Sequence, residues 1–191
     1  MQYTESIQAI KQACKFISDG QIDEAAQHID DHYPFKPLEK LIRKPTLLQM
    51  TNIFIRDGFI DRYKGHPLVF PPSLRLISHY LPKAFPYHPN GKMSVGHIAY
   101  WQLFPTIDHI YPVARGGKDE ESNWISCSML TNSIKSNWTL AELGWGEPLP
   151  PGDMTHWDGT AGWFIDQIKS NKSLLSINYL KNWYNAAKNL K

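Results

Sequence analysis

The sequence predicts an α+β fold with a small strand–loop–strand–helix core between an N-terminal helical hairpin and C-terminal helices. Apolar residues recur at helical spacing from Glu5 to Ile17 and again from Trp163 onward. Between these regions, two β-prone segments, Thr106 to Ile110 and Trp124 to Ser126, flank a polar loop that contains glycine. Strands in one short span with helices on both sides are typical of the α+β class.

The N-terminal element, residues 1–45, is predicted to be a helical hairpin. The first helix carries apolar side chains at Ile7, Ile10 and Ile17, and Asp19-Gly20 ends it. Helical spacing resumes from Gln21 to His32, after which two prolines stop the second helix. We expect an accessory helical layer here.

The central part, residues 46–145, is predicted to hold the core. Frequent prolines before Trp101 favour short elements joined by fixed loops. A helix is expected to begin near Ser128, and Thr139 to Glu142 fits a capping box for a short helix that ends at Gly144. Residues 146–162 are rich in proline and glycine and indicate a linker.

The last part, residues 146–191, is predicted to place C-terminal helices against the core, so that both form one domain. Helices are expected from about Trp163 to Ser170 and from about Leu174 to Leu190. From Trp163 onward there are five lysines and one acid. This surplus suits either a grip on phosphates or a solvated helix face.

Composition indicates an ordinary globular protein. The chain has 191 residues, is 42% hydrophobic and carries a formal net charge of +2, which is low for a protein dedicated to binding duplex DNA. No apolar run is long enough to cross a bilayer and the N-terminus lacks a signal-peptide pattern, so we expect a cytoplasmic protein with no membrane partner. Cys14 and Cys127 are expected to be reduced thiols.

The segment around Asp108-His109 contains the side chains that metal-assisted hydrolysis of a phosphodiester needs. An unperturbed imidazole changes its charge near neutrality, so a histidine at position 109 is a suitable residue type to accept a proton from water. Asp108 and Asn132 offer the hard oxygen ligands that Mg²⁺ or Mn²⁺ prefers, and two protein ligands leave positions open for water and phosphate. The sequence thus provides a base and a metal site.

The run Ile107-Asp108-His109-Ile110 and the residues that follow it resemble the core of the HNH endonucleases. The further matching positions are Pro112, Gly116-Gly117, Asn123, Asn132 and Lys135, and the glycine pair permits a tight or left-handed backbone. His109 lies 14 positions before Asn123, which lies 9 before Asn132, as is usual in that family. The resemblance covers Thr106 to Lys135 closely and the remaining chain only loosely.

This resemblance implies a ββα-metal fold and hydrolysis of DNA by a metal-dependent endonuclease. His109 is the implied general base, Asp108 and Asn132 are the implied Mg²⁺ or Mn²⁺ ligands, and Asn123 holds the loop that positions the base. Lys135, on the same helix face as Asn132, and Arg115 are the candidate phosphate contacts.

The sequence departs from many family members at the positions that bind structural zinc. Asp61, Lys64, Ser128 and Thr131 stand where two Cys-x-x-Cys pairs usually stand. These four side chains cannot form a tetrahedral zinc site, so we expect no structural zinc, with packing or an ion pair such as Asp61–Lys64 in its place. The aromatic residues that flank the motif are expected to form a core rather than a base-stacking platform: Trp101, Phe104, Tyr111, Trp124 and Trp138.

The functional expectation is an HNH-type endonuclease acting on double-stranded DNA, with restriction or another defence role as a family-level guess. A one-site enzyme that cuts both strands favours a homodimer or sequential nicking. Two alternatives use the same scaffold: a non-catalytic DNA-binding module, and an RNase or nonspecific nuclease toxin. The residues quoted above do not separate DNA from RNA as substrate.

Overall fold

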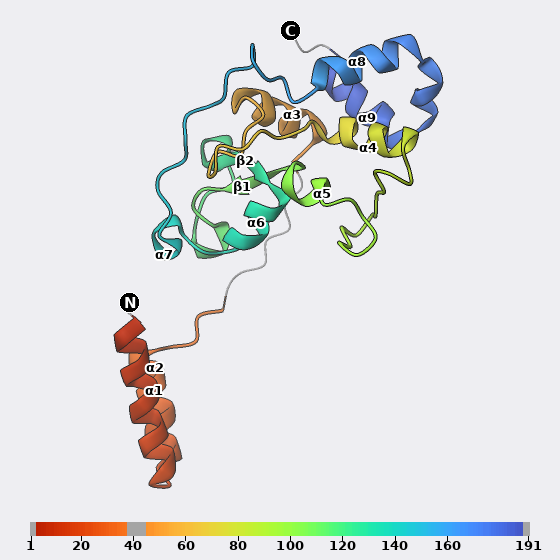
Figure 1. Ribbon diagram of the computed structural model, residues 1–191. Coiled ribbons are helices and arrows are strands. Elements are labelled where there is room, and N and C mark those ends of the chain that lie inside the picture. The colour runs from red at the N-terminus through yellow and green to blue at the C-terminus, as the bar shows by residue number, and fades with distance from the viewer. Residues whose placement is uncertain (1–2, 38–44, 189–191) are drawn as a thin grey trace. The chain divides into compact units, whose positions relative to one another are not determined.

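The computed structural model describes residues 3–37 and 45–188 and separates into two compact units, Met1–Glu39 and Lys40–Lys191 (Figure 1). Its secondary structure is mixed, with helices and one small antiparallel sheet, which confirms the α+β class. None of the described helices is long and apolar enough to span a membrane.

The first unit is a hairpin of two helices, α1 (Tyr3–Ser18) and α2 (Ile22–His32). Gly20 separates them in the left-handed conformation, with φ of 77°. Small side chains, Ala9 and Ala13 of α1 and Ala25 of α2, are buried. The predicted helical hairpin is therefore present, one or two residues longer at the start of its first helix.

The second unit contains the sheet and the remaining helices. Their order along the chain is α3 (Leu47–Arg56), α4 (Pro71–Tyr80), α5 (Ala99–Gln102), β1 (Pro105–His109), β2 (Trp124–Ser128), α6 (Met129–Lys135), α7 (Leu140–Leu143), α8 (Ala161–Ser170) and α9 (Asn178–Ala187). Short 3-10 turns lie at Val113–Arg115, Glu121–Asn123 and Lys172–Ser176.

The hydrophobic core of this unit lies where α3, α4, α8 and α9 meet (Figure 1). Phe54, Phe59, Phe70 and Phe164 are fully buried there, and Trp183 packs edge-on against Phe70. Aromatic side chains bury large apolar areas, so this cluster anchors the C-terminal helices to the central part of the chain. The sheet contacts the same body through α3.

The predicted helix from Leu174 to Leu190 is divided in the structure. A 3-10 turn, Lys172–Ser176, comes first, and α9 begins only at Asn178 because Ile177 is extended, with φ of −83° and ψ of 103°. The break turns the chain so that Leu174 and Leu180 are both buried. Leu190, the predicted end, lies outside the described residues.

Candidate active site

The candidate site is formed by β1, the loop after it, β2 and α6. The strands pair antiparallel from Pro105 opposite Ser128 to His109 opposite Trp124. Ser128 caps α6 by accepting a hydrogen bond from the Thr131 amide, so the helix starts directly after β2 and contacts both strands. The predicted order of strand, loop, strand and helix is present, with β2 two residues longer than predicted.

The loop between the strands is held by the side chain of Asn123. Its oxygen accepts a hydrogen bond from the Tyr111 amide at 2.9 Å, and its nitrogen donates to the carbonyls of Tyr111 and Lys118 at 2.9 and 2.8 Å. A Cβ atom at Gly117 would lie 2.1 Å from the Tyr111 carbonyl oxygen, so only glycine fits there. Gly116 has φ of 92°, the left-handed conformation expected of the glycine pair.

His109 ends β1 and contacts an acid that the loop returns to it. Its Nε2 lies 2.8 Å from Oδ1 of Asp119, and the Trp124 indole nitrogen lies 3.0 Å from both atoms. The consistent assignment has Nε2–H and the indole N–H both donating to the carboxylate. Among the described residues, Nδ1 of His109 then has no partner and remains able to accept a proton. This is the geometry of an acid-oriented imidazole base.

Asp108 is buried on the side of β1 that α6 covers. Its Oδ2 accepts hydrogen bonds from the Tyr63 hydroxyl and the Lys135 ammonium, both at 2.8 Å. Lys135 is fully buried and also donates to the His109 carbonyl at 2.7 Å. Burial, with the adjacent carboxylate of Asp108, raises the pKa of Tyr63 far above its ordinary value, so this phenol stays a donor.

The position of Lys135 corrects the expectation that it meets a phosphate. Lys135 and Asn132 do share the α6 face that covers β1, as their spacing predicted. That face is turned into the protein, however, so the ammonium neutralises Asp108 instead of reaching the surface. The spacing alone could not show which way the shared face points.

Two side-chain oxygens on the covered side of β1, of the type that a hard cation prefers, make no hydrogen bond among the described residues. The Asn132 side-chain nitrogen donates to the Thr106 hydroxyl at 2.9 Å and the Ile107 carbonyl at 3.3 Å, which leaves its oxygen unbonded within the described ranges. Asp108 Oδ1 is likewise without a hydrogen bond there. The described residues contain no group of three or more His, Cys, Asp or Glu that could hold a metal, so any cation here would rely mainly on water and substrate oxygens.

Arg115 lies on the exposed part of the loop. Its guanidinium is 3.4 Å from Glu142 and lies 5.6 Å from the ring centre of Trp138. Trp138 and Tyr111 are each about half exposed, at 49% and 51%, whereas Trp124 is buried. The expectation that all the flanking aromatic residues form a core is therefore wrong for these two.

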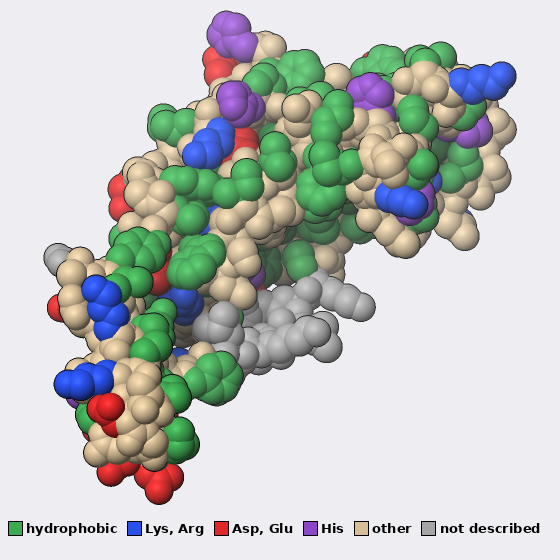
Figure 2. All heavy atoms as spheres, turned by 60° about the horizontal axis from the view of Figure 1, so that its bottom comes forward, with side chains coloured by type: hydrophobic (Ala, Val, Ile, Leu, Met, Phe, Trp, Pro, Cys, Tyr) green, Lys and Arg blue, Asp and Glu red, His purple; other side chains and the backbone are tan. Residues whose placement is uncertain are grey.

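On the face drawn in Figure 2, Lys and Arg side chains stand singly among hydrophobic and uncharged ones.

Comparison with known proteins finds no match among family models, curated proteins or solved structures.

Asp61, Lys64, Ser128 and Thr131, the four positions considered above for zinc, are joined in part by hydrogen bonds. Asp61 is fully buried, and its carboxylate accepts from the amides of Tyr63, Lys64 and Ser128 at 3.0, 3.1 and 3.0 Å. The Ser128 hydroxyl donates to Thr131 Oγ1 at 2.9 Å. One carboxylate thus ties the turn after α3 to the start of α6.

The prediction of an ion pair between Asp61 and Lys64 is wrong. The Lys64 ammonium lies over the Trp145 ring, 3.8 Å from its centre, and only the Lys64 amide reaches Asp61. A short turn brings the amide of the third residue to the carboxylate, and the long side chain then points away. The prediction identified the right segment and the wrong interaction.

A second buried acid, Asp57, forms hydrogen bonds that hold β2 in place. Its carboxylate accepts from the Ser126 amide and from Arg62, both at 2.7 Å. Arg56, also bonded to Asp57, donates to the carbonyls of Glu121 and Trp124 at 3.0 and 2.6 Å. The end of α3 is therefore fixed to the loop that carries Asp119 and to β2.

Sequence reasoning missed Asp119, Tyr63 and Asp57. Asp119 follows the glycine pair. A loop tight enough to require glycine at position 117 brings the residues after it back toward β1, so the glycine pair could have indicated Asp119. Tyr63 and Asp57 come from the turn after α3, more than forty residues before β1. No local pattern connects them to the site.

Proposed function

We propose that this protein is a metal-dependent endonuclease of the HNH type, built on a ββα-metal core, that hydrolyses phosphodiester bonds in double-stranded DNA. The observation that carries the proposal is the arrangement of two adjacent side chains, Asp108 and His109, at the end of β1. There an imidazole oriented by Asp119 follows directly after a carboxylate whose Oδ1 is available. The spacing of Asn123, Asn132 and Lys135 supports the same assignment.

His109 is the general base of the proposed reaction. Its Nδ1 takes a proton from the attacking water, whose oxygen bonds to phosphorus while the bond to the 3′ oxygen breaks. The Asp119 carboxylate, 2.8 Å from Nε2, stabilises the imidazolium that forms. The departing 3′ oxygen takes its proton from solvent, so the products carry 5′-phosphate and 3′-hydroxyl ends, as the family resemblance implies.

Asp108 Oδ1 and the Asn132 side-chain oxygen are the atoms that would hold Mg²⁺ or Mn²⁺. When bound, the cation supplies Lewis-acid stabilisation of the charge that develops on the phosphate and the leaving oxygen. Lys135 has a supporting role, because its ammonium lies 2.8 Å from Asp108 Oδ2 and holds the carboxylate in position. Asn123 fixes the loop and thereby the Asp119–His109 pair.

The exposed loop is the proposed DNA contact. Arg115, with the half-exposed rings of Tyr111 and Trp138 nearby, offers a cation and stacking surfaces next to the strand end. The modest net charge of +2 fits recognition of a limited stretch of DNA more than a wide electrostatic grip. A cytoplasmic defence or restriction role and a homodimer that cuts both strands complete the proposal.

A non-catalytic DNA-binding module is the second candidate, and one observation favours it. Lys135 already neutralises Asp108 within the protein, which lets the scaffold be stable without a cation. The two candidates differ in turnover, because a binding module would hold DNA without cutting it.

Matched DNA and RNA duplexes test the proposal. The purified protein is incubated with end-labelled duplexes of the same sequence, with Mg²⁺, Mn²⁺ or EDTA, and the product ends are mapped. Metal-dependent cuts in DNA that leave 5′-phosphates support the endonuclease. Cuts confined to RNA support the RNase alternative. Binding of DNA without cuts in either metal supports the binding module and overturns the catalytic proposal.

A further inference from the structure

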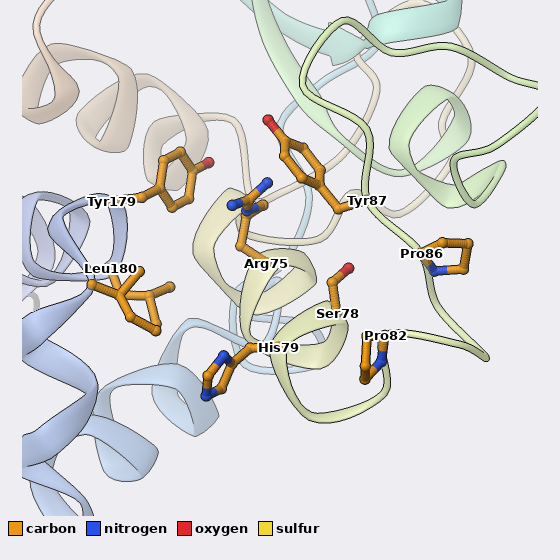
Figure 3. Close-up of a pocket in the computed structure, with 9 residues that line it drawn as sticks. Arg75, Ser78, His79, Pro82, Pro86, Tyr87, Tyr179 and Leu180 are labelled. Atoms are coloured by element: carbon orange, nitrogen blue, oxygen red, sulfur yellow. The ribbon is translucent and has the colours of Figure 1, made fainter.

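A cavity of the Lys40–Lys191 unit, separate from the candidate active site, contains Arg75, which has no counter-ion among the described residues. The cavity, of about 300 Å³, lies between α4, the loop that follows α4 and the start of α9 (Figure 3). Arg75 projects into it from α4, between Tyr87 of the loop and Tyr179 of α9. The residues that form the candidate active site are not among those that line it.

The Arg75 guanidinium lies against two tyrosine rings. Its central carbon lies 3.2 Å from the ring centre of Tyr87 and 5.2 Å from that of Tyr179. Within residues 3–37 and 45–188, its Nη1 is buried and has no hydrogen-bond partner, and Arg75 forms no ion pair. A buried donor of a charged group without a partner is costly, and proteins seldom retain one without a use.

The cavity walls supply no acid that could neutralise this charge. The lining residues are Arg75, Ser78, His79, Pro82, Pro86, Tyr87, Ile177, Tyr179 and Leu180. The Ser78 hydroxyl is already bonded to the Tyr100 hydroxyl at 2.6 Å. The cavity is therefore lined by one guanidinium, one imidazole and two tyrosine side chains among mostly apolar residues.

These features match a small anion that carries a flat ring. A guanidinium presents two parallel N–H donors, which suit the paired oxygens of a phosphate. Tyr87 is 40% exposed, so its side chain stays accessible to a base at the edge of the cavity, while Arg75 lies over its ring and Tyr100 contacts it in a T-shaped arrangement. A cavity of about 300 Å³ is at the lower end of the range for small-ligand sites, which fits one nucleotide and not a dinucleotide.

We propose that this cavity binds the phosphate of a single nucleotide unit, with Arg75 as the oxyanion contact and Tyr87 as the stacking surface. The nucleotide can be free, in which case the cavity is an effector site. Alternatively, it can belong to a DNA strand, in which case the cavity is a second DNA contact. The assignment rests on Arg75 and its surroundings and is independent of the proposed nuclease chemistry.

Calorimetric titration in EDTA tests the free-nucleotide source, because no cleavage can occur there. The full chain is titrated with inorganic phosphate and with nucleoside 5′-monophosphates, at ionic strength matched by chloride. Arg75→Gln removes the charge, and Lys172→Gln is the control, since its ammonium also lies near a tyrosine ring, Tyr184, outside the cavity. We expect at least about tenfold weaker binding by Arg75→Gln and unchanged binding by Lys172→Gln.

Duplex binding, also in EDTA, tests the DNA source. If free nucleotides do not bind, a tenfold loss of duplex affinity in Arg75→Gln, absent in Lys172→Gln, supports the strand contact. Equal affinity of wild type and Arg75→Gln for nucleotides and for duplex overturns the proposal.

A further measurement covers the case in which Arg75→Gln does not fold. Tyr87→Leu keeps the guanidinium but removes the stacking ring and is expected to weaken nucleotide or duplex binding more than it weakens binding of inorganic phosphate. In wild type, the NMR signal of the Arg75 side-chain N–H groups is expected to shift on titration with whichever ligand binds. An unmoved signal at saturating ligand would contradict the assignment.

Discussion

Replacement of Lys135 by methionine tests the finding that this lysine is structural. The substitution keeps the long apolar stem and removes the ammonium that bonds Asp108 at 2.8 Å and the His109 carbonyl at 2.7 Å. Lys135 is fully buried, and the Asp108 side chain is 9% exposed, so water has poor access to the position that the ammonium occupies beside Asp108 Oδ2. The variant would leave a buried carboxylate held by Tyr63 alone.

The expected loss in the free energy of unfolding is about 3 kcal/mol, at the lower end of the range for breaking a buried ion pair on one side, because Tyr63 still donates to Asp108. Urea unfolding followed by tryptophan fluorescence measures this directly. All seven tryptophans lie in the Lys40–Lys191 unit, so the signal reports on the unit that holds the site.

Two controls separate the ion pair from a generic loss of lysine. Lys118→Met makes the same change at a side chain that is 79% exposed and should alter stability by less than about 0.5 kcal/mol. Combining Lys135→Met with Asp108→Asn removes the unpaired charge and should recover at least about 1 kcal/mol relative to the sum of the single variants. A Lys135→Met variant as stable as Lys118→Met would refute the reasoning.

Three further results are expected. Asp119→Asn should slow DNA cleavage at least about tenfold without changing DNA affinity in a filter-binding assay, because the amide no longer stabilises the His109 imidazolium; an unchanged single-turnover rate would show that the Asp119 contact is incidental. Burial raises the pKa values of Tyr63 and Cys127 in the folded protein, so the unfolded chain releases these protons first. The free energy of unfolding should therefore fall as pH rises above the ordinary pKa of each group, which is about 8.5 for cysteine and about 10 for tyrosine. The fall should be at most about 1.4 kcal/mol per pH unit per group, and the slope should be shallower in Tyr63→Phe. Elemental analysis of protein purified without chelator should find less than one zinc per chain, since Asp61 is satisfied by three amides, and stoichiometric zinc would show that some other ligand set exists.

The local parts of the fold could be predicted because local signals determine them. The strand ends near Thr106 and Trp124, the capping box at Thr139 and the left-handed Gly116 each depend on neighbouring residues. The structure places each within a few residues of the prediction. Asn123 belongs to the same class, since its bonds all stay within the loop it closes.

The parts that could not be predicted depend on contacts between distant segments. Whether Lys135 faces solvent or Asp108 is decided by how α6 packs on β1, and helical spacing is the same in both cases. Tyr63 meets Asp108 across 45 positions of the chain. No sequence pattern marks Arg75. Its isolation from acids, among the described residues, arises only when α4, α9 and the loop between α4 and α5 enclose it.

Cleavage of supercoiled plasmid by wild type and by His109→Ala tests whether the protein is a metal-dependent endonuclease with His109 as its base. Each protein is incubated with plasmid in Mg²⁺, Mn²⁺ or EDTA, and DNA binding is measured in parallel. We expect nicked or linear plasmid from wild type with either metal, none with EDTA, and none from His109→Ala, which still binds DNA. Equal cleavage by His109→Ala, or intact plasmid with wild type in both metals, would contradict this assignment.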